Sequence, residues 1–221
     1  GRAADQCRAN VSGIGGTNMP DHRGVPSKFF HEIYGQVPAW EIGAPQPEVV
    51  RLAQEGKFQG RVLDIGGGTG ENALLLASRS LDVTSFDLVP AAVARARAKA
   101  EQRGLRVDFR VGSAREMADW REQFDTALDS GVFHVFSDDD RPRFLAGLRA
   151  VLRPGGRFFL LCFSELETSE IGPRRLRAAE LRDCFEADFE VEELRRTRYA
   201  SLAHPGGAHA WLAELRRREP S

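Results

Sequence analysis

The sequence predicts an α/β fold with a doubly wound sheet of seven strands, helices on both faces and a C-terminal antiparallel hairpin. Strand-like and helix-like segments alternate after Gly60, which is typical of parallel strands joined by helical crossovers. The run 157–163 is apolar on both faces, as expected for a strand in the middle of such a sheet. The last two strand candidates have no helix between them, and they therefore predict a hairpin.

The N-terminal part of the chain is expected to lie outside this sheet. Residues 1–27 are rich in glycine and proline and have almost no periodic apolar pattern. Such a segment buries too little surface to offset its ordering entropy, so we expect a mobile arm or a lid over a bound ligand. Residues 28–59 are expected to form a helical cap, in which a short amphipathic helix and a helix at 48–56 flank a rigid loop at 40–47.

Residues 60–221 are expected to form the α/β domain. Pro90 stands where the first turn of a helix tolerates proline, and Gly104 is expected to end that helix. A loop with the sequence His204-Pro205-Gly206-Gly207 is expected between the last two strands. The strands are expected at 61–65, 82–86, 106–111, 124–129, 157–163, 189–194 and 208–215. The helices are expected at 71–80, 90–103, just after 112, at 138–152 and at 178–184.

The balance of charged residues indicates which kinds of partner the protein can be expected to bind. Lysine and arginine number 31, aspartate and glutamate number 32, and the net charge is -1. Nucleic acids and anionic membranes both favour a basic excess, so neither is expected as a partner. No apolar run is long enough to cross a bilayer, and residues 1–27 lack the apolar stretch of a signal peptide. We expect a soluble, cytoplasmic protein without a metal site, either a monomer or a homodimer that acts on a small molecule.

A glycine loop follows the first strand of the domain. Residues 66–70 read Gly-Gly-Gly-Thr-Gly, and such a loop lets a ligand approach the backbone closely. A phosphate-binding loop would need Gly-Lys-Ser/Thr at its end, where this chain has Gly70-Glu71-Asn72. The dinucleotide fingerprint would need its third glycine at the position of Glu71, whose carboxylate is unfavourable beside a pyrophosphate.

The loop and three further segments resemble the class I S-adenosylmethionine-dependent methyltransferases over about residues 60–217. The segments are Val62-Leu63-Asp64-Ile65 with the glycine loop, Asp87 at the end of the second strand, Phe124-Asp125 at the start of the fourth, and Leu152-Arg153-Pro154-Gly155-Gly156 before the fifth. The resemblance implies a Rossmann-like fold and a methyltransferase activity. It also implies S-adenosyl-L-methionine as cofactor, with S-adenosyl-L-homocysteine as product.

The resemblance implies where this cofactor binds. Asp87 is expected to accept hydrogen bonds from both ribose hydroxyls. In the family, an acidic residue after the third strand usually binds the adenine amino group; here Ser113 or a backbone carbonyl must replace it. Asp129 or Ser130 is expected to contact the ammonium group. The expected cofactor-binding residues are Trp40, Asp64, Gly66, Gly67, Gly68, Thr69, Gly70, Asn72, Asp87, Leu88, Ser113, Ala114, Asp129 and Ser130.

The loop at 40–47 is similar to the stretch before the cofactor domain in thiopurine, halide and thiol methyltransferases and in mycobacterial enzymes that methylate heterocyclic toxins. This similarity implies that Trp40 covers the sulfonium region, although a role as a core anchor is equally open. The expected acceptor pocket consists of Phe30, Tyr34, Phe133 and His134. His134 is the candidate general base, and the alternative is a hydrogen bond to the backbone only.

The predicted reaction is an in-line transfer of the methyl group to a nitrogen, oxygen or sulfur atom of a small heteroaromatic molecule. Two other functions stay open at this point. One is a reductase that uses NAD(P) on the same kind of sheet, which Glu71 disfavours. The other is a protein that binds the sulfonium cofactor but uses it for chemistry other than methylation.

Overall fold

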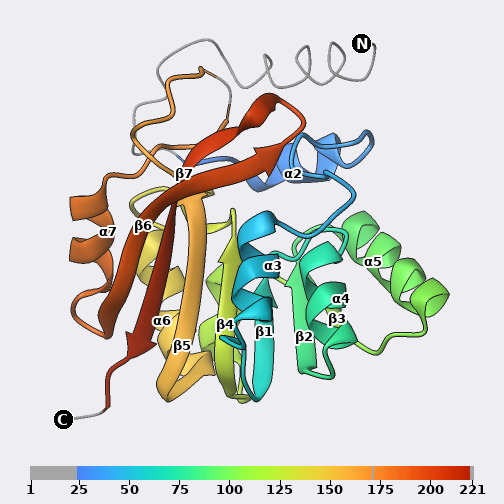
Figure 1. Ribbon diagram of the computed structural model, residues 1–221, viewed down its shortest axis with the longest axis horizontal. Helices are drawn as coiled ribbons and strands as arrows, with labels where there is room; N and C mark the ends of the chain where they lie inside the picture. The colour runs from blue at the N-terminus through green and yellow to red at the C-terminus, as the bar shows by residue number, and fades with distance from the viewer. Residues whose placement is uncertain (1–23, 171, 220–221) are drawn as a thin grey trace.

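The computed structural model describes residues 24–170 and 172–219, which form a seven-stranded sheet in the order β3-β2-β1-β4-β5-β7-β6 (Figure 1). Strands β1 to β5 pair in parallel, whereas β7 pairs antiparallel with both β5 and β6. This arrangement confirms the predicted doubly wound sheet with a C-terminal hairpin. The strands are β1 Arg61–Ile65, β2 Asp82–Asp87, β3 Asp108–Val111, β4 Phe124–Ser130, β5 Leu152–Phe163, β6 Phe189–Ser201 and β7 His204–Arg217.

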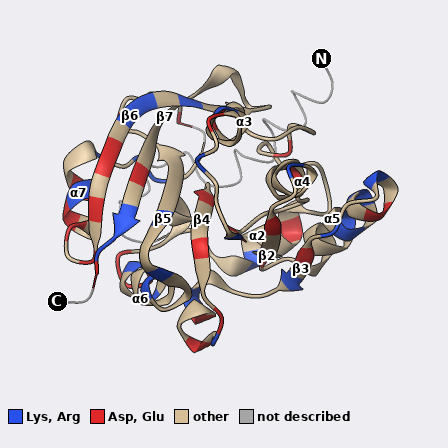
Figure 2. Cartoon of the chain, turned by 60° about the horizontal axis from the view of Figure 1, so that its bottom comes forward, with Lys and Arg blue, Asp and Glu red and all other residues tan. Residues whose placement is uncertain are grey.

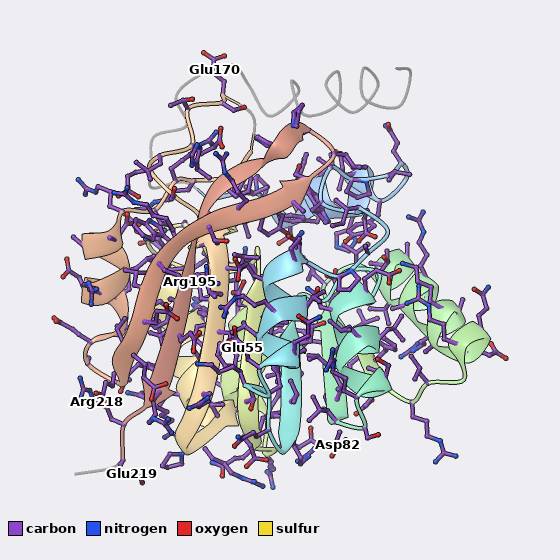
Figure 3. All side chains as sticks on the ribbon, viewed as in Figure 1. Glu55, Asp82, Glu170, Arg195, Arg218 and Glu219 are labelled. Atoms are coloured by element: carbon purple, nitrogen blue, oxygen red, sulfur yellow. The ribbon has the colours of Figure 1, made fainter. Side chains whose placement is uncertain are left out.

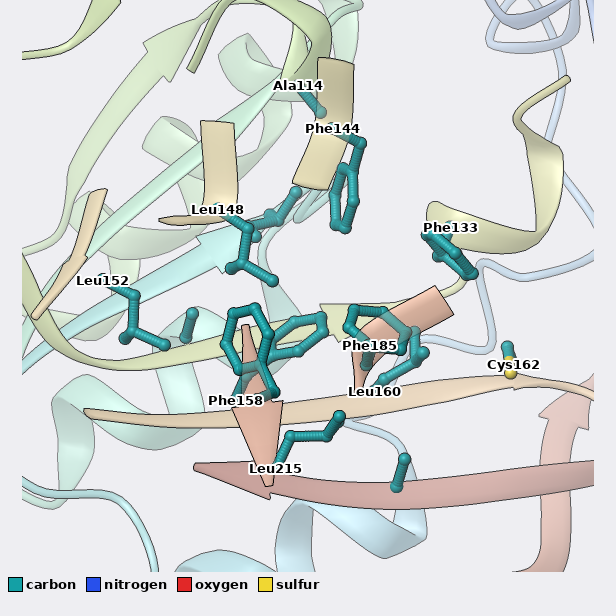
Figure 4. Packing of buried hydrophobic residues seen from close by; sticks show 14 of the residues in the cluster. Ala114, Phe133, Phe144, Leu148, Leu152, Phe158, Leu160, Cys162, Phe185 and Leu215 are labelled. Carbon is teal, nitrogen blue, oxygen red and sulfur yellow. The ribbon is translucent and has the colours of Figure 1, made fainter. Parts of the chain in front are cut away.

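Two layers of apolar side chains cover the two faces of the sheet. On one face, α6 and α7 pack against residues such as Leu63 and Phe158 (Figure 4). On the other, α3, α4 and α5 pack against residues such as Val62 and Leu128. The alternation of Val62 and Leu63 between the layers follows from the period of two in a strand. The helices are α2 Ser27–Ile33, α3 Pro47–Gln54, α4 Glu71–Ser78, α5 Pro90–Arg103, α6 Arg141–Val151 and α7 Ala178–Phe185, with short 3₁₀ turns η2 Ala114–Asp119 and η3 Phe133–Val135.

Helix α5 begins and ends where the sequence predicts. Pro90 lies in its first turn, and Gly104 ends it in the left-handed conformation with φ 62°. Helix α6 instead begins at Arg141, three residues later than predicted, with Pro142 in its first turn. None of the helices in the described part of the chain is long and apolar enough to span a membrane.

The hairpin is longer than predicted, and its turn lies elsewhere. Strands β6 and β7 are joined at Leu202 and Ala203, so His204-Pro205-Gly206-Gly207 belongs to β7 rather than to a loop. The pairing slips between Tyr199 and Ser201, where β7 carries extra residues. Gly206 and Gly207 have φ values of 78° and 81°, which glycine adopts without strain. The predicted breakers therefore mark a bulge inside a strand.

The cap and the hairpin meet above the carboxyl ends of the parallel strands, at the top of Figure 1. The backbone N–H of Leu202 donates to the carbonyl of Ala39 over 2.7 Å. The side chain of Gln46 exchanges two hydrogen bonds with the backbone of Ala200, each of 2.9 Å. Of the expected N-terminal arm, residues 1–23 lie outside the described residues, and Val25 is buried and donates to the carbonyl of Val135.

Candidate active site

A cavity of about 1130 Å³ lies between the carboxyl ends of the parallel strands, the cap and the hairpin. Its volume exceeds the roughly 300–1,000 Å³ that is usual for a pocket with one drug-sized ligand, so it has room for two ligands side by side. The predicted site residues that line it are Phe30, Tyr34, Trp40, Gly66, Asp87, Leu88, Ser113, Ala114, Ser130 and His134. Those that do not line it are Asp64, Gly67, Gly68, Thr69, Gly70, Asn72, Asp129 and Phe133.

The glycine loop is held tightly against β1 and β2. The backbone N–H of Gly67 donates to the carbonyl of Phe86 over 2.9 Å. A Cβ atom at Gly67 would lie 2.1 Å from Oγ of Ser85 and 2.4 Å from Oδ2 of Asp64. Gly66 is left-handed with φ 64°, and a Cβ atom there would lie 2.1 Å from Val132. Packing thus requires glycine at both positions, and Gly66 exposes its backbone to the cavity.

Three carboxylates gather at the carboxyl ends of β1, β2 and β4; Asp64 and Asp129 are fully buried, and Asp87 is half-buried. Asp64 accepts a hydrogen bond from Oγ of Ser85 over 2.9 Å, and burial raises its pKa to about 7. Asp129 accepts from the backbone N–H groups of Val132 and Phe133, and burial likewise raises its pKa to about 7. The pKa of Asp87 is also raised by burial.

The hydrogen bonds of these carboxylates come from backbone N–H groups and a hydroxyl group. Asp87 accepts hydrogen bonds from the backbone N–H groups of Gly68 and Val89, each over 2.9 Å. Within residues 24–170 and 172–219, neither it nor Asp64 nor Asp129 forms an ion pair with a lysine or an arginine. A buried carboxylate without a counter-charge is costly, and a cationic ligand would offset that cost. This end of the cavity therefore suits a positively charged molecule.

Two predicted cofactor-binding residues, Thr69 and Asn72, hold the cap to the glycine loop and its helix instead. The carboxylate of Glu41 accepts from the backbone N–H of Thr69 over 3.3 Å and also from its hydroxyl. Oδ1 of Asn72 accepts from the backbone N–H of Gln46 over 2.9 Å. Since neither Thr69 nor Asn72 lines the cavity, their observed role is to fix the cap over the loop.

Aromatic side chains of the cap form one wall of the cavity. The ring of Trp40 lies 6.1 Å from that of Phe30 and 6.2 Å from that of Tyr34, and its Nε1 donates to the Tyr34 hydroxyl over 3.1 Å. Phe133 does not join them. It is fully buried between Phe144 and Phe185, with ring centroids 5.4 and 5.2 Å away. The prediction of Phe133 as a pocket residue was wrong, because η3 turns this side chain into the core.

His134 has a structural hydrogen bond that the sequence did not reveal. Its Nδ1 accepts from the backbone N–H of Phe163 over 3.0 Å, and its ring is almost completely buried. Burial lowers the pKa of His134 to about 3, so the imidazole is neutral at physiological pH and only weakly basic. These properties argue against the predicted general base and favour the alternative of a backbone hydrogen bond.

His134→Leu tests this structural role. The change leaves the Phe163 N–H without an acceptor, so we expect the free energy of unfolding at pH 7.5 to fall by about 1–3 kcal/mol. The folded pKa of about 3 lies below the unfolded value, so the stability that neutral His134 contributes is lost as pH falls from about 6.5 towards 3. Urea unfolding at several pH values should show a weaker acid destabilisation in the variant than in the wild type. A variant with unchanged stability but abolished turnover would contradict this account.

The cavity is also lined by residues that were not predicted from the sequence. Phe163 at the end of β5, Tyr199 of β6 and His204 of β7 all line it. The ring of Phe163 lies 5.6 Å from that of Tyr199 and 5.4 Å from that of His204. The one sequence signal near them is the His-Pro-Gly-Gly run, which indicates an unusual backbone but not its position over the cavity.

Comparisons with known proteins agree with this geometry. Residues 62–156 match the family model described as a methyltransferase domain. The 2-heptyl-1-hydroxyquinolin-4(1H)-one methyltransferase of Mycobacteroides abscessus is 31% identical over 164 residues, which cover 73% of this chain and 72% of the relative. The chain belongs to the class I S-adenosylmethionine-dependent methyltransferases. It is therefore an enzyme with S-adenosyl-L-methionine as its cofactor and a small molecule as its substrate.

Two solved structures extend the comparison of this methyltransferase. One is 34% identical to this chain, with a TM-score of 0.80, and the match covers 89% of this chain and 94% of the other. It belongs to work described as "Conversion of a Disulfide Bond into a Thioacetal Group during Echinomycin Biosynthesis". The other is the 1,6-didemethyltoxoflavin-N1-methyltransferase of Burkholderia thailandensis, with 24% identity, coverage of 87% and 84%, and a TM-score of 0.64. Because the second structure is only 24% identical, it shows that the fold is shared and nothing more.

The residues present fit the cofactor of the family. S-adenosyl-L-methionine carries a sulfonium and an ammonium group, which suit three carboxylates that form no ion pair with a lysine or an arginine of the described residues. It has no phosphate, and the loop from 66 to 70 contains neither lysine nor arginine. The cavity is lined by Gly66 and by Asp87 at the end of β2. A nucleoside bound there can therefore contact both a backbone group and a carboxylate.

Proposed function

We propose that this methyltransferase transfers a methyl group to a nitrogen, oxygen or sulfur atom of a small heteroaromatic acceptor by in-line displacement. The observation that carries the proposal is one cavity with two unlike ends. Buried carboxylates at the glycine loop favour a cation, whereas aromatic rings of the cap and hairpin favour a flat, apolar molecule. Holding the two ligands in line contributes to the rate by positioning.

The cofactor is proposed to bind at the acidic end. Asp87 would accept from the ribose hydroxyls, while Leu88, Ser113 and Ala114 would border the adenine. Asp64 and Asp129 do not line the cavity, so they would act on the ammonium and sulfonium groups through their charge. Trp40 would face the sulfonium with a cation–π attraction of about 0.5–2 kcal/mol. When bound, the cofactor supplies an activated methyl group.

The acceptor is proposed to bind beside the cap, against Phe30 and Tyr34. The names of two similar proteins support a heteroaromatic ring, since one acts on a hydroxyquinolone and another on didemethyltoxoflavin. The burial of Tyr34 raises its pKa well above the usual value, so its hydroxyl stays protonated and donates to the carboxylate of Glu41 over 3.5 Å rather than acting as a base.

A sulfur acceptor is the second candidate. The solved structure with 34% identity and a TM-score of 0.80 belongs to work on the conversion of a disulfide bond into a thioacetal group. A probable thiol methyltransferase of Arabidopsis thaliana is 29% identical over 144 residues. A thiolate or a disulfide sulfur offers a lone pair without a base, which is consistent with the low pKa of His134.

A transfer assay separates these candidates. The wild-type protein is incubated with methyl-labelled S-adenosyl-L-methionine and, separately, with a 1-hydroxyquinolin-4-one, an aromatic thiol and a disulfide-bridged cyclic peptide. We expect label in the hydroxyquinolone. Label only in the thiol or the peptide would favour the sulfur candidate. Cofactor binding without transfer to any of the three would contradict both.

The proposal also covers the class of substrate, the location and the oligomeric state of the enzyme. Basic and acidic side chains are both spread over the elements of the fold (Figure 2), and the net charge is -1, which supports a free small molecule rather than a nucleic acid as the substrate. We further propose a cytoplasmic monomer or homodimer. Within the described residues, no cluster of three or more histidine, cysteine, aspartate or glutamate side chains could hold a metal ion.

A further inference from the structure

Gln46 is buried where the cap meets both the hairpin and the helix that follows the glycine loop. It directly precedes α3 and is 4% exposed. Its Oε1 accepts from the backbone N–H of Ala200, and its Nε2 donates to the carbonyl of the same residue, each over 2.9 Å. Its own backbone N–H donates to Oδ1 of Asn72 over 2.9 Å. One residue of the cap is thus hydrogen-bonded to the hairpin and to α4.

At the hairpin, Gln46 takes the place of a neighbouring strand. The pairing of β6 with β7 slips between Tyr199 and Ser201, and Ala200 has no partner on β7. A side-chain amide offers both a donor and an acceptor, as a backbone does, so Gln46 satisfies both backbone groups of Ala200. Tyr199 and Ser201, on either side of Ala200, both line the cavity. The contact with Gln46 therefore holds a part of the cavity wall in place.

At the other end, Asn72 connects Gln46 to the glycine loop. Asn72 is the second residue of α4, which begins directly after Gly70. It does not line the cavity, so its hydrogen bond acts on the cavity wall through Gln46. The cap has a second contact of this kind, because the carboxylate of Glu41 accepts from the backbone N–H of Thr69 over 3.3 Å. The positions of the glycine loop and of the cap are therefore linked at two points.

The wall that Gln46 holds lies between the two ends of the cavity. The hydroxyl of Tyr199 donates to the carbonyl of Ser130 at the end of β4, over 3.3 Å. The ring of Tyr199 also lies 5.6 Å from that of Phe163, at planes of 61°. A movement of β6 at Ala200 would change both contacts, since Tyr199 is the next residue of the strand.

We propose that Gln46 is a positioning residue that couples the cofactor end of the cavity to the acceptor end, an assignment that rests on the proposed function. A bound cofactor holds the glycine loop, and the cap and the hairpin are then held with it through Asn72 and Gln46. This fixes Tyr199 and Ser201 for the acceptor. Because coupling between two sites is reciprocal, each ligand raises the affinity for the other by the same factor. Gln46 itself does not line the cavity and acts through its neighbours.

The test measures this coupling in the full chain. Calorimetry gives the Kd of a 1-hydroxyquinolin-4-one with and without saturating S-adenosyl-L-homocysteine, and the ratio of the two values is the coupling factor. We expect a factor of about ten in the wild type and of less than about two in Gln46→Glu. This variant keeps the size of the side chain, but its carboxylate cannot donate to the carbonyl of Ala200. The Kd of S-adenosyl-L-homocysteine alone should stay within about twofold.

Steady-state kinetics separate positioning from a loss of folded protein. In Gln46→Glu, the KM of the acceptor should rise about tenfold, while kcat stays within about threefold. A protein that is only destabilised would contain fewer active molecules, so its kcat would fall while the KM and the coupling factor stayed at their wild-type values.

Two further variants complete the test. Gln54→Glu is the matched control, because it makes the same change at an exposed position of α3, and its coupling factor should equal that of the wild type. Gln46→Met removes both side-chain hydrogen bonds without adding a charge, so it should also lose the coupling. It decides the matter if Gln46→Glu does not fold.

Two outcomes bear on different claims. A coupling factor that is retained in Gln46→Met, or that is absent from a wild type that methylates the hydroxyquinolone, would overturn the assignment to Gln46 alone. If the transfer assay labels another acceptor, the same measurements are made with that acceptor. A wild type that binds S-adenosyl-L-homocysteine and methylates none of the acceptors would contradict the proposed function and the assignment with it.

Discussion

Asp87→Asn is expected to weaken the binding of S-adenosyl-L-homocysteine about tenfold or more. Hydrogen bonds to a charged group contribute about 1.5–3 kcal/mol each, and every 1.4 kcal/mol is a factor of ten in affinity. The asparagine amide has one acceptor oxygen, and its NH₂ group would face the N–H of Gly68 or Val89. Isothermal titration calorimetry measures the effect directly.

Asp82→Asn is the matched control for this experiment. Asp82 lies at the other end of β2 (Figure 3), where its side chain is 71% exposed and pairs with Arg61 over 3.3 Å. The control should bind S-adenosyl-L-homocysteine as the wild type does. Because burial raises the pKa of Asp87, its replacement by a neutral amide should not greatly lower the stability of the ligand-free protein. Unchanged affinity in Asp87→Asn would show that the ribose binds elsewhere.

Gly67→Ala is expected to destabilise the protein by about 1–3 kcal/mol and to weaken cofactor binding strongly. The new methyl group would lie 2.1 Å from Oγ of Ser85 and 2.4 Å from Oδ2 of Asp64. Both atoms belong to a buried hydrogen bond between neighbouring strands, so they cannot move aside without breaking it. The loop must then shift away from β1 and β2, and Gly66 moves with it. Urea unfolding and calorimetry report the two effects.

Gly112→Ala provides a comparison with the same chemical change. A Cβ atom at Gly112 would lie 3.8 Å from Phe86 and 3.8 Å from Trp120, which is ordinary contact. Its free energy of unfolding should therefore stay within about 0.5 kcal/mol of the wild-type value. If both variants were equally stable and bound the cofactor alike, the tight packing of the glycine loop would be disproved.

The features that could be predicted from the sequence are those that local pattern determines. The order of strands and helices, the position of Gly66–Gly70 and the limits of α5 follow from apolar periodicity and from residues with special backbone preferences. Asp87 could be placed at the cavity because the carboxyl ends of parallel strands meet at one edge of the sheet.

Other features depend on contacts between distant segments. Phe133 and His134 are neighbours, yet Phe133 faces the core and His134 faces the cavity. No local pattern in the sequence shows which way η3 turns these side chains. His204 reaches the cavity because the pairing of β6 with β7 slips near Ser201, which no local pattern predicted. The absence of cationic partners for Asp64 and Asp129 within the described ranges likewise depends on the whole fold.

Calorimetric titration with S-adenosyl-L-methionine and with NADPH tests the central claim most directly, because the two ligands carry opposite charge. The three carboxylates beside the glycine loop should attract the sulfonium compound and repel a pyrophosphate. Lys99 and Arg103, the basic residues next to the loop, are already paired with Glu71, each over 2.9 Å. We predict saturable binding of S-adenosyl-L-methionine and no heat of binding with NADPH. Binding of NADPH alone, or of neither ligand at millimolar concentration, would contradict the account.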